Sequence, residues 1–238
     1  MPVTRWVDKA YVTSPAVPPV TAPCHHRRVT RTPAEAWAAL RDGNRRFVGG
    51  TPEHPNQDAG RRSELAEGQR PFALVFGCSD SRVAAEIVFD RGLGDLFVVR
   101  TAGHVVDTGV LGSIEFGVAE LQVPLVVVLG HDSCGAVRAT LDAHAGGEIP
   151  GGYVRNVIEL VTPSVLDARR RGIEDVDGVV HEHARRTADL LLDRSAAIAE
   201  RVGDGRVAVV SVGYKLARGE AQLLSAHGDV GPELAAAG

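Results

Sequence analysis

The sequence predicts an α/β fold with a mostly parallel sheet and helices on both faces. Four short runs are almost continuously apolar or β-branched, which is typical of strands that are buried on both faces of a parallel sheet. Longer segments with helical periodicity separate these runs. The runs are residues 72–76, 96–99, 125–129 and 206–212. A hydrophobic fraction of 44% in 238 residues is enough to fill the core of such a domain.

The chain is expected to begin with an arm. Residues 1–31 are rich in Pro, Val and Thr, and their prolines break any helix or central strand. We therefore predict an extended or disordered N-terminal arm over 1–31 and a single domain over 32–238. The first helix should start at Thr32, because Thr32 is a good N-cap, Pro33 suits the first helical position and Glu35 completes a capping box. Gly49 and Gly50 are expected to end it.

Helical segments are predicted between the strands. They cover residues 83–89, 108–121, 136–144, 154–171 and 181–201. The glycine-rich stretch 146–152 falls inside the last connection and reads as a flexible hinge, because the strand that follows must return to the same sheet.

Composition excludes several classes of partner and location. The net charge is -4 with both signs scattered, so no basic stripe is available for nucleic acid. No apolar run approaches the ~18 residues of a membrane helix, and the first twenty residues do not resemble a secretory signal. We therefore expect a cytoplasmic protein with no nucleic-acid or membrane partner. Three cysteines, an odd number, argue against a disulfide framework.

Metal-ligating side chains follow two of the predicted strands. Cys78 comes directly after the first strand, and His131 and Cys134 come directly after the third. Sites in open parallel sheets form beyond the carboxyl ends of strands, so the two loops meet if these strands are neighbours. The result would be two thiolates and one imidazole around one point.

This ligand set predicts a catalytic zinc site with one ion per chain. Two Cys and one His suit Zn²⁺, and three protein ligands leave one tetrahedral position for water. Bound zinc brings the pKa of that water to about 7. Asp80 lies two residues after Cys78 and can accept a hydrogen bond from the bound nucleophile, while Arg82 can hold the Asp80 carboxylate in a bidentate pair. Without Arg82, Asp80 could become a fourth ligand in a closed state.

The two motifs, Cys78-Ser79-Asp80-Ser81-Arg82 and Gly130-His131-Asp132-Ser133-Cys134-Gly135, resemble those of the β-class carbonic anhydrases of bacteria. The resemblance covers roughly residues 33 to 217. It implies zinc-dependent reversible hydration of carbon dioxide to bicarbonate and a proton, and a sheet in strand order 2-1-3-4. It also implies a homodimer or a dimer of dimers with active sites at subunit interfaces.

The same resemblance implies a substrate pocket. Its members would be Gln69, Phe97, Phe116 and Gly135, with Phe116 donated by the partner subunit. Some bacterial relatives carry a noncatalytic bicarbonate site of Trp, Arg and Tyr. Arg100 and Tyr214 match two of these positions, but Val75 stands at the Trp position, which argues against that site here.

Two alternatives remain at this point. The same fold could hydrolyse carbonyl sulfide or carbon disulfide, or the chain could be a catalytically silent zinc-binding protein that senses bicarbonate. The intact Asp80–Arg82 pair argues against the silent protein.

The remaining histidines are not part of the predicted zinc site. The tract Cys24-His25-His26 reads as an incidental exposed cluster, and His181 and His183 as surface residues at the start of a helix. His104, near Asp107, is a candidate relay for the product proton.

Overall fold

The computed structural model describes residues 31–232 and confirms the predicted fold class. Five strands form one sheet in the order β2-β1-β3-β4-β5. They are β1 (Ala73–Cys78), β2 (Leu96–Thr101), β3 (Leu125–His131), β4 (Ala208–Lys215) and β5 (Glu220–His227). The first four are parallel, and β1 and β3 are neighbours as expected. Apart from Arg31, the predicted N-terminal arm lies outside the described residues.

The fifth strand was not predicted. β5 pairs antiparallel with β4 at the edge of the sheet, and most of its residues are only partly buried. Its sequence, EAQLLSAH, mixes polar and apolar residues, as expected for a strand whose side chains are all partly buried or exposed. The continuous apolar run that marks a central strand is therefore missing.

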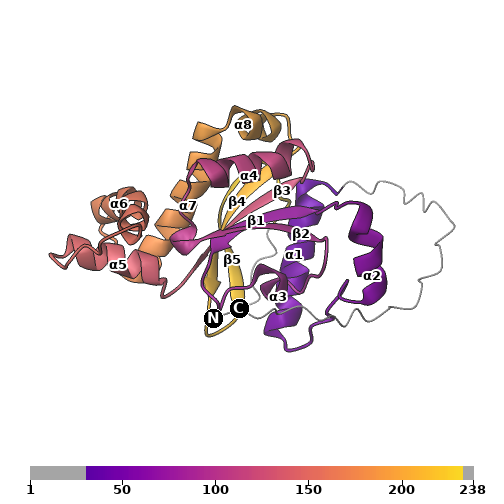
Figure 1. Ribbon diagram of the computed structural model, residues 1–238, viewed down its shortest axis with the longest axis horizontal. Helices are drawn as coiled ribbons and strands as arrows, with labels where there is room; N and C mark the ends of the chain where they lie inside the picture. The colour runs from indigo at the N-terminus through magenta and orange to yellow at the C-terminus, as the bar shows by residue number, and fades with distance from the viewer. Residues whose placement is uncertain (1–30, 233–238) are drawn as a thin grey trace, which may run out of the picture.

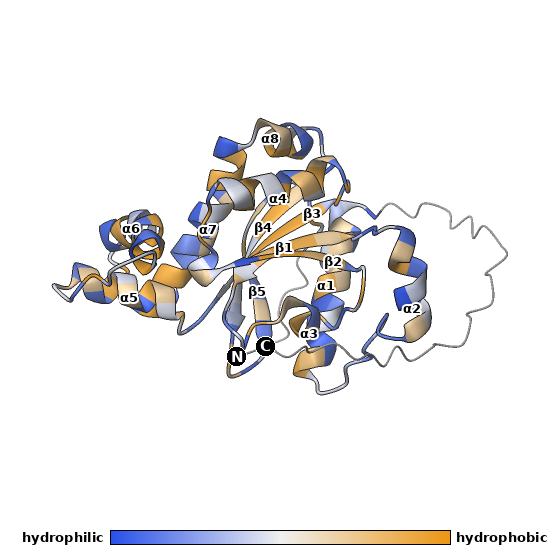
Figure 2. Cartoon of the chain, in the orientation of Figure 1, coloured by the Kyte–Doolittle hydropathy of each residue, from blue (hydrophilic) through white to orange (hydrophobic). Residues whose placement is uncertain are grey.

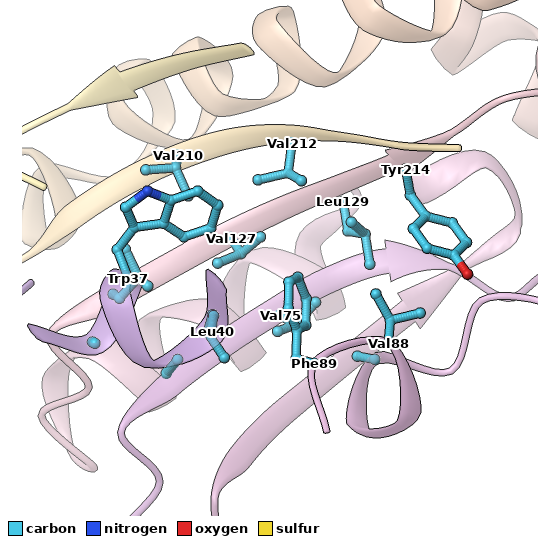
Figure 3. Packing of buried hydrophobic residues seen from close by; sticks show 14 of the residues in the cluster. Trp37, Leu40, Val75, Val88, Phe89, Val127, Leu129, Val210, Val212 and Tyr214 are labelled. Carbon is cyan, nitrogen blue, oxygen red and sulfur yellow. The ribbon is translucent and has the colours of Figure 1, made fainter. Parts of the chain in front are cut away.

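Alternate residues of the central strands pack into two separate cores, one on each face of the sheet. Val75, Val127 and Val210 face α1 (Pro33–Val48) and α3 (Ala85–Val88), as Figure 3 shows for the labelled side chains. Leu74, Phe76 and their neighbours face the helices of the opposite layer. Figure 2 shows the corresponding apolar strands at the centre of the molecule.

The opposite layer consists of α4 (Thr108–Ala119), α7 (Val176–Arg194) and α8 (Ala196–Gly203) (Figure 1). The predicted single helix over 181–201 is wrong in two respects. The helix already begins after Asp175, whose side chain caps it. It then breaks at Ser195, whose hydroxyl accepts a hydrogen bond from the Ile198 N–H and so starts α8.

The remaining helices lie at the two ends of the sheet. The long connection contains α5 (Gly135–His144) and α6 (Val154–Arg170), which pack with α7 around a third core that includes Cys78 and Cys134. On the opposite side lie the short α2 (Ala59–Glu64) and the 3-10 turn η1 (Leu65–Glu67), which were not predicted (Figure 1). A second 3-10 turn, η2 (Ala102–His104), follows β2. None of the described helices combines the length and apolarity needed to cross a bilayer.

Candidate metal centre

Cys78, His131 and Cys134 come together at the carboxyl ends of β1 and β3. Their potential ligand atoms all lie within 4.8 Å of one another, and all three side chains are buried. Cys78 is the last residue of β1, His131 is the last of β3, and Cys134 is the N-cap of α5. The pairing of β1 with β3 is what brings the two loops together.

The chemistry of His131 fits a metal ion. Its Nδ1 lies 2.9 Å from the Asp132 carbonyl oxygen, which only accepts, so Nδ1 carries the proton. The opposite nitrogen, Nε2, is then a lone-pair donor. It is buried and has no hydrogen-bond partner among the described residues. A buried nitrogen without a hydrogen-bond partner destabilises the fold unless another group binds its lone pair, and a metal ion would do so.

Cys78 lies in surroundings that stabilise a thiolate. The Cys134 thiol beside it, together with the Gly103 N–H that donates to Sγ at 3.2 Å, holds the pKa of Cys78 well below its usual value. The same proximity and burial raise the pKa of Cys134. In the absence of a cation the two sulfurs therefore share one negative charge, and a divalent ion would allow both to ionise.

Asp80 and Arg82 form a bidentate pair beside the three ligands. Arg82 Nε lies 2.9 Å from Asp80 Oδ1 and Nη2 lies 2.7 Å from Oδ2, while the Arg82 backbone N–H also donates to Oδ1 at 3.0 Å. These bonds hold the pKa of Asp80 well below its usual range. Asp80 Oδ2 lies 3.9 Å from His131 Nε2, so the carboxylate borders the centre and stays ionised.

Two further charged residues hold the ligand loops from outside. Arg100 donates from Nε to the Cys78 carbonyl at 3.0 Å and from Nη2 to the Asp80 carbonyl at 2.7 Å. Asp177, in the first turn of α7, accepts from the Ser133 N–H at 3.1 Å. Each loop is therefore tied to a neighbouring element as well as to its own strand.

The predicted substrate-pocket residues are not all brought to this centre within one chain. Gly135 begins α5 directly after Cys134, whereas Gln69 is exposed between η1 and β1. Phe97 pairs in register with Leu74, four residues before Cys78, which is about 13 Å along the strand. The Phe97 and Phe116 rings lie near each other, with centroids 6.2 Å apart, and Phe116 is 47% exposed.

The structure overturns two interpretations of histidines. His183 is not on the surface: it lies inside α7 and is 3% exposed. His104 is fully buried, and burial holds its pKa well below the usual value. Its burial separates the ring from solvent, which argues against a role as the proton relay. Nearby Asp107 instead caps α4 by accepting from the Val110 N–H. The tract Cys24-His25-His26 lies outside the described residues.

The residues that match the noncatalytic bicarbonate site serve other contacts here. Val75 and Tyr214 belong to the same apolar core, and Tyr214 is 4% exposed. The Arg100 guanidinium is engaged by the two backbone carbonyls of the Cys78 loop.

Sequence reasoning missed three residues around the centre: Gly103, Asp177 and the buried His183. Gly103 follows β2 and adopts a left-handed conformation, φ +65, with a Cβ position only 2.7 Å from Ala136 Cβ. A glycine two residues after the end of β2 was the available signal. No such sequence signal marks Asp177 or His183, because only the packing of α7 brings them near the ligand loops.

The chain matches a known protein family and several of its members. The carbonic anhydrase family matches residues 73–221. Carbonic anhydrase 2 of Mycobacterium tuberculosis is 56% identical over 202 residues, which is 85% of this chain and 98% of that protein. The carbonic anhydrase of Mycolicibacterium smegmatis is 57% identical over 199 residues, covering 84% and 97%.

Solved structures agree on the fold. A tetrameric β-carbonic anhydrase of Sordaria macrospora superposes with a TM-score of 0.62 at 24% identity, over 77% of this chain and 94% of that one. The Coccomyxa β-carbonic anhydrase, solved with acetazolamide, gives 0.63 at 24% identity, over 79% and 86%.

Proposed function

The chain belongs to the β-carbonic anhydrase family, and from this premise we propose that it hydrates carbon dioxide reversibly with one zinc ion held by Cys78, His131 and Cys134. The observation that carries the proposal is the buried group of two sulfurs and one unpartnered imidazole nitrogen within 4.8 Å. Two cysteines and one histidine are the donor set of catalytic rather than closed structural zinc sites. Zinc bound there would supply a Lewis acid that makes a water molecule nucleophilic near neutral pH.

Asp80 and Arg82 would orient the nucleophile. The Asp80 carboxylate stays ionised because Arg82 donates to both of its oxygens. It can therefore accept a hydrogen bond from the attacking oxygen but cannot give it a proton, which fixes the direction of the lone pair that attacks carbon dioxide. If the pair breaks, the freed carboxylate is near enough to His131 to approach the ligand position itself, which would close the site.

We expect the substrate pocket to be completed by a second copy of the chain. β2 is an edge strand of the sheet, and the exposed Phe116 lies over its Phe97. In this arrangement Phe116 of one subunit would line the apolar pocket of its partner, while Gln69 and Gly135 would contact substrate from the same chain. A homodimer or a dimer of dimers satisfies this expectation.

Stopped-flow hydration of carbon dioxide by the purified protein tests the proposal. We expect zinc near one per chain and activity that rises toward alkaline pH, while Asp80→Asn should retain zinc and lose activity. Full zinc without hydration at pH 8 and above would refute the enzymatic proposal. Parallel assays on carbonyl sulfide and carbon disulfide would identify a different substrate for the same site.

A further inference from the structure

A buried histidine outside the metal centre is linked to one of its sulfurs through a single glycine. His183 lies in α7, and its Nε2 is 2.8 Å from the Gly103 carbonyl oxygen. The Gly103 N–H in turn donates to Cys78 Sγ at 3.2 Å. The two bonds connect α7 to the end of β1 through residues that are distant in sequence.

We propose that His183 is a positioning residue for the metal centre: it fixes the Gly103 backbone so that its N–H donates to the Cys78 sulfur, and thereby sets the strength of the metal–sulfur bond. The inference rests on the proposed role of Cys78 as a metal ligand. His183 itself would contact neither the metal ion nor the substrate.

The hydrogen bonds of His183 define its protonation. A carbonyl oxygen only accepts, so Nε2 must carry a proton to bond Gly103. Burial lowers the pKa of His183 to about 4, so the ring is neutral at physiological pH and Nδ1 keeps its lone pair. Ser164 Oγ, 2.8 Å from Nδ1, then donates its proton to the ring. The Gly103 carbonyl thus selects the tautomer, and the Ser164 hydroxyl on α6 satisfies the remaining ring nitrogen.

The backbone of Gly103 needs the His183 hydrogen bond to hold its conformation. Its φ of +65 and ψ of +22 lie in the left-handed region, which a glycine enters and leaves with little cost. Rotation about its two dihedrals would turn the N–H away from the sulfur. The His183 bond holds the carbonyl on one side of Gly103, the Cys78 bond holds the N–H on the other, and the Ala136 side chain limits the space between them.

A hydrogen bond from an N–H to a thiolate changes how strongly the sulfur binds a metal ion. It draws charge from the sulfur, which weakens its donation to a metal ion and leaves the metal a stronger Lewis acid. It also orients the lone pairs that remain for the metal. Outer-shell partners of this kind typically change metal affinity or activity by about 10- to 100-fold.

A pair of substitutions separates positioning from simple packing. The amide nitrogen of Gln can occupy the place of the histidine Nε2, whereas the shorter Asn reaches only the place of Nδ1. In cobalt(II)-loaded protein we expect His183→Asn to shift the sulfur-to-cobalt charge-transfer band and to change zinc affinity, measured by chelator competition, by about 10-fold or more. His183→Gln should restore both toward wild type.

Leu191→Ala is the matched control, because Leu191 is fully buried two turns further along α7 in a core away from the centre. It should lower the unfolding temperature without moving the band. Equal bands and zinc affinities in wild type, His183→Asn and His183→Gln would overturn the inference, as would an equal shift in Leu191→Ala.

A measurement on the unmodified chain covers the case in which His183→Asn does not fold. In cadmium-113-loaded protein, the amide proton of Gly103 should show scalar coupling to the metal across the N–H···S bond, and an absent coupling would overturn the inference. Wild-type protein that binds neither cobalt nor zinc would instead refute the metal centre itself, which is a different result.

Discussion

Replacing Gly103 by alanine should damage both the stability of the fold and the metal centre. Left-handed backbone costs a residue with a Cβ roughly 1–2 kcal/mol. The new Cβ would stand 2.7 Å from Ala136 Cβ, and such overpacking costs about 1–3 kcal/mol more. We therefore expect Gly103→Ala to lower the free energy of unfolding by roughly 2–5 kcal/mol, which is about 5–20 °C in Tm for a domain of this size.

The clash would also disturb the proposed metal ligands. Ala136 is the second residue of α5, two positions after Cys134, so relief of the contact must move the start of α5 or the Gly103 backbone that donates to Cys78. Zinc content should fall with stability. Thermal unfolding of metal-free protein measures the first effect, and metal analysis after dialysis measures the second.

Gly172→Ala provides the control. Gly172 also has a positive φ, +74, but a Cβ there meets open space after α6. It should cost only the backbone term of about 1–2 kcal/mol and leave zinc at the wild-type level. If the two variants unfold at the same temperature and bind equal zinc, the packing of Gly103 against α5 does not support the centre, and the reasoning fails.

Four other perturbations have defined outcomes. Cys134→Ser should lose zinc and reduce hydration to background in a stopped-flow assay, because a hydroxyl is a poor zinc ligand; retained activity would exclude Cys134 as a ligand. Arg82→Ala frees the Asp80 carboxylate to approach the proposed metal position, so hydration should fall while zinc is retained; a wild-type kcat/KM at every pH would contradict this. Chelation should abolish activity but preserve the far-UV circular dichroism, because the two sheet cores lie apart from the centre; unfolding on chelation would show a structural metal. His183 binds a proton below about pH 6.5 in the unfolded chain but only near pH 4 in the folded chain. Its contribution to the free energy of unfolding, measured by urea titration, should therefore fall by roughly 3 kcal/mol as the pH is lowered through this interval. An equal fall in His183→Gln would assign the loss to other groups.

The parallel sheet and the candidate ligand set could both be predicted from the amino-acid sequence. Three of the four apolar runs are central strands, in which burial on both faces leaves no polar side. The fourth, β2, lies at an edge of the sheet and is only partly buried, so its apolar run identified a strand but not its place in the sheet. The motifs around Cys78 and His131 were readable because ligands that follow neighbouring parallel strands share one edge of the sheet. These are local signals, and each is complete within a few consecutive residues.

The other residues around the centre could be found only from the way the helices pack on the sheet. His183 lies 80 positions from Gly103. It was interpreted as a surface residue at the start of a predicted helix, and nothing nearby in the sequence indicates its burial. Phe97 and Phe116 looked like pocket residues, yet within one chain they lie away from Cys78, since strand register sets their distance. Burial and long-range hydrogen bonds arise only when helices pack on the sheet. The short-range pattern of the sequence therefore predicts the candidate ligands, and the packing of α7 fixes which residues surround them.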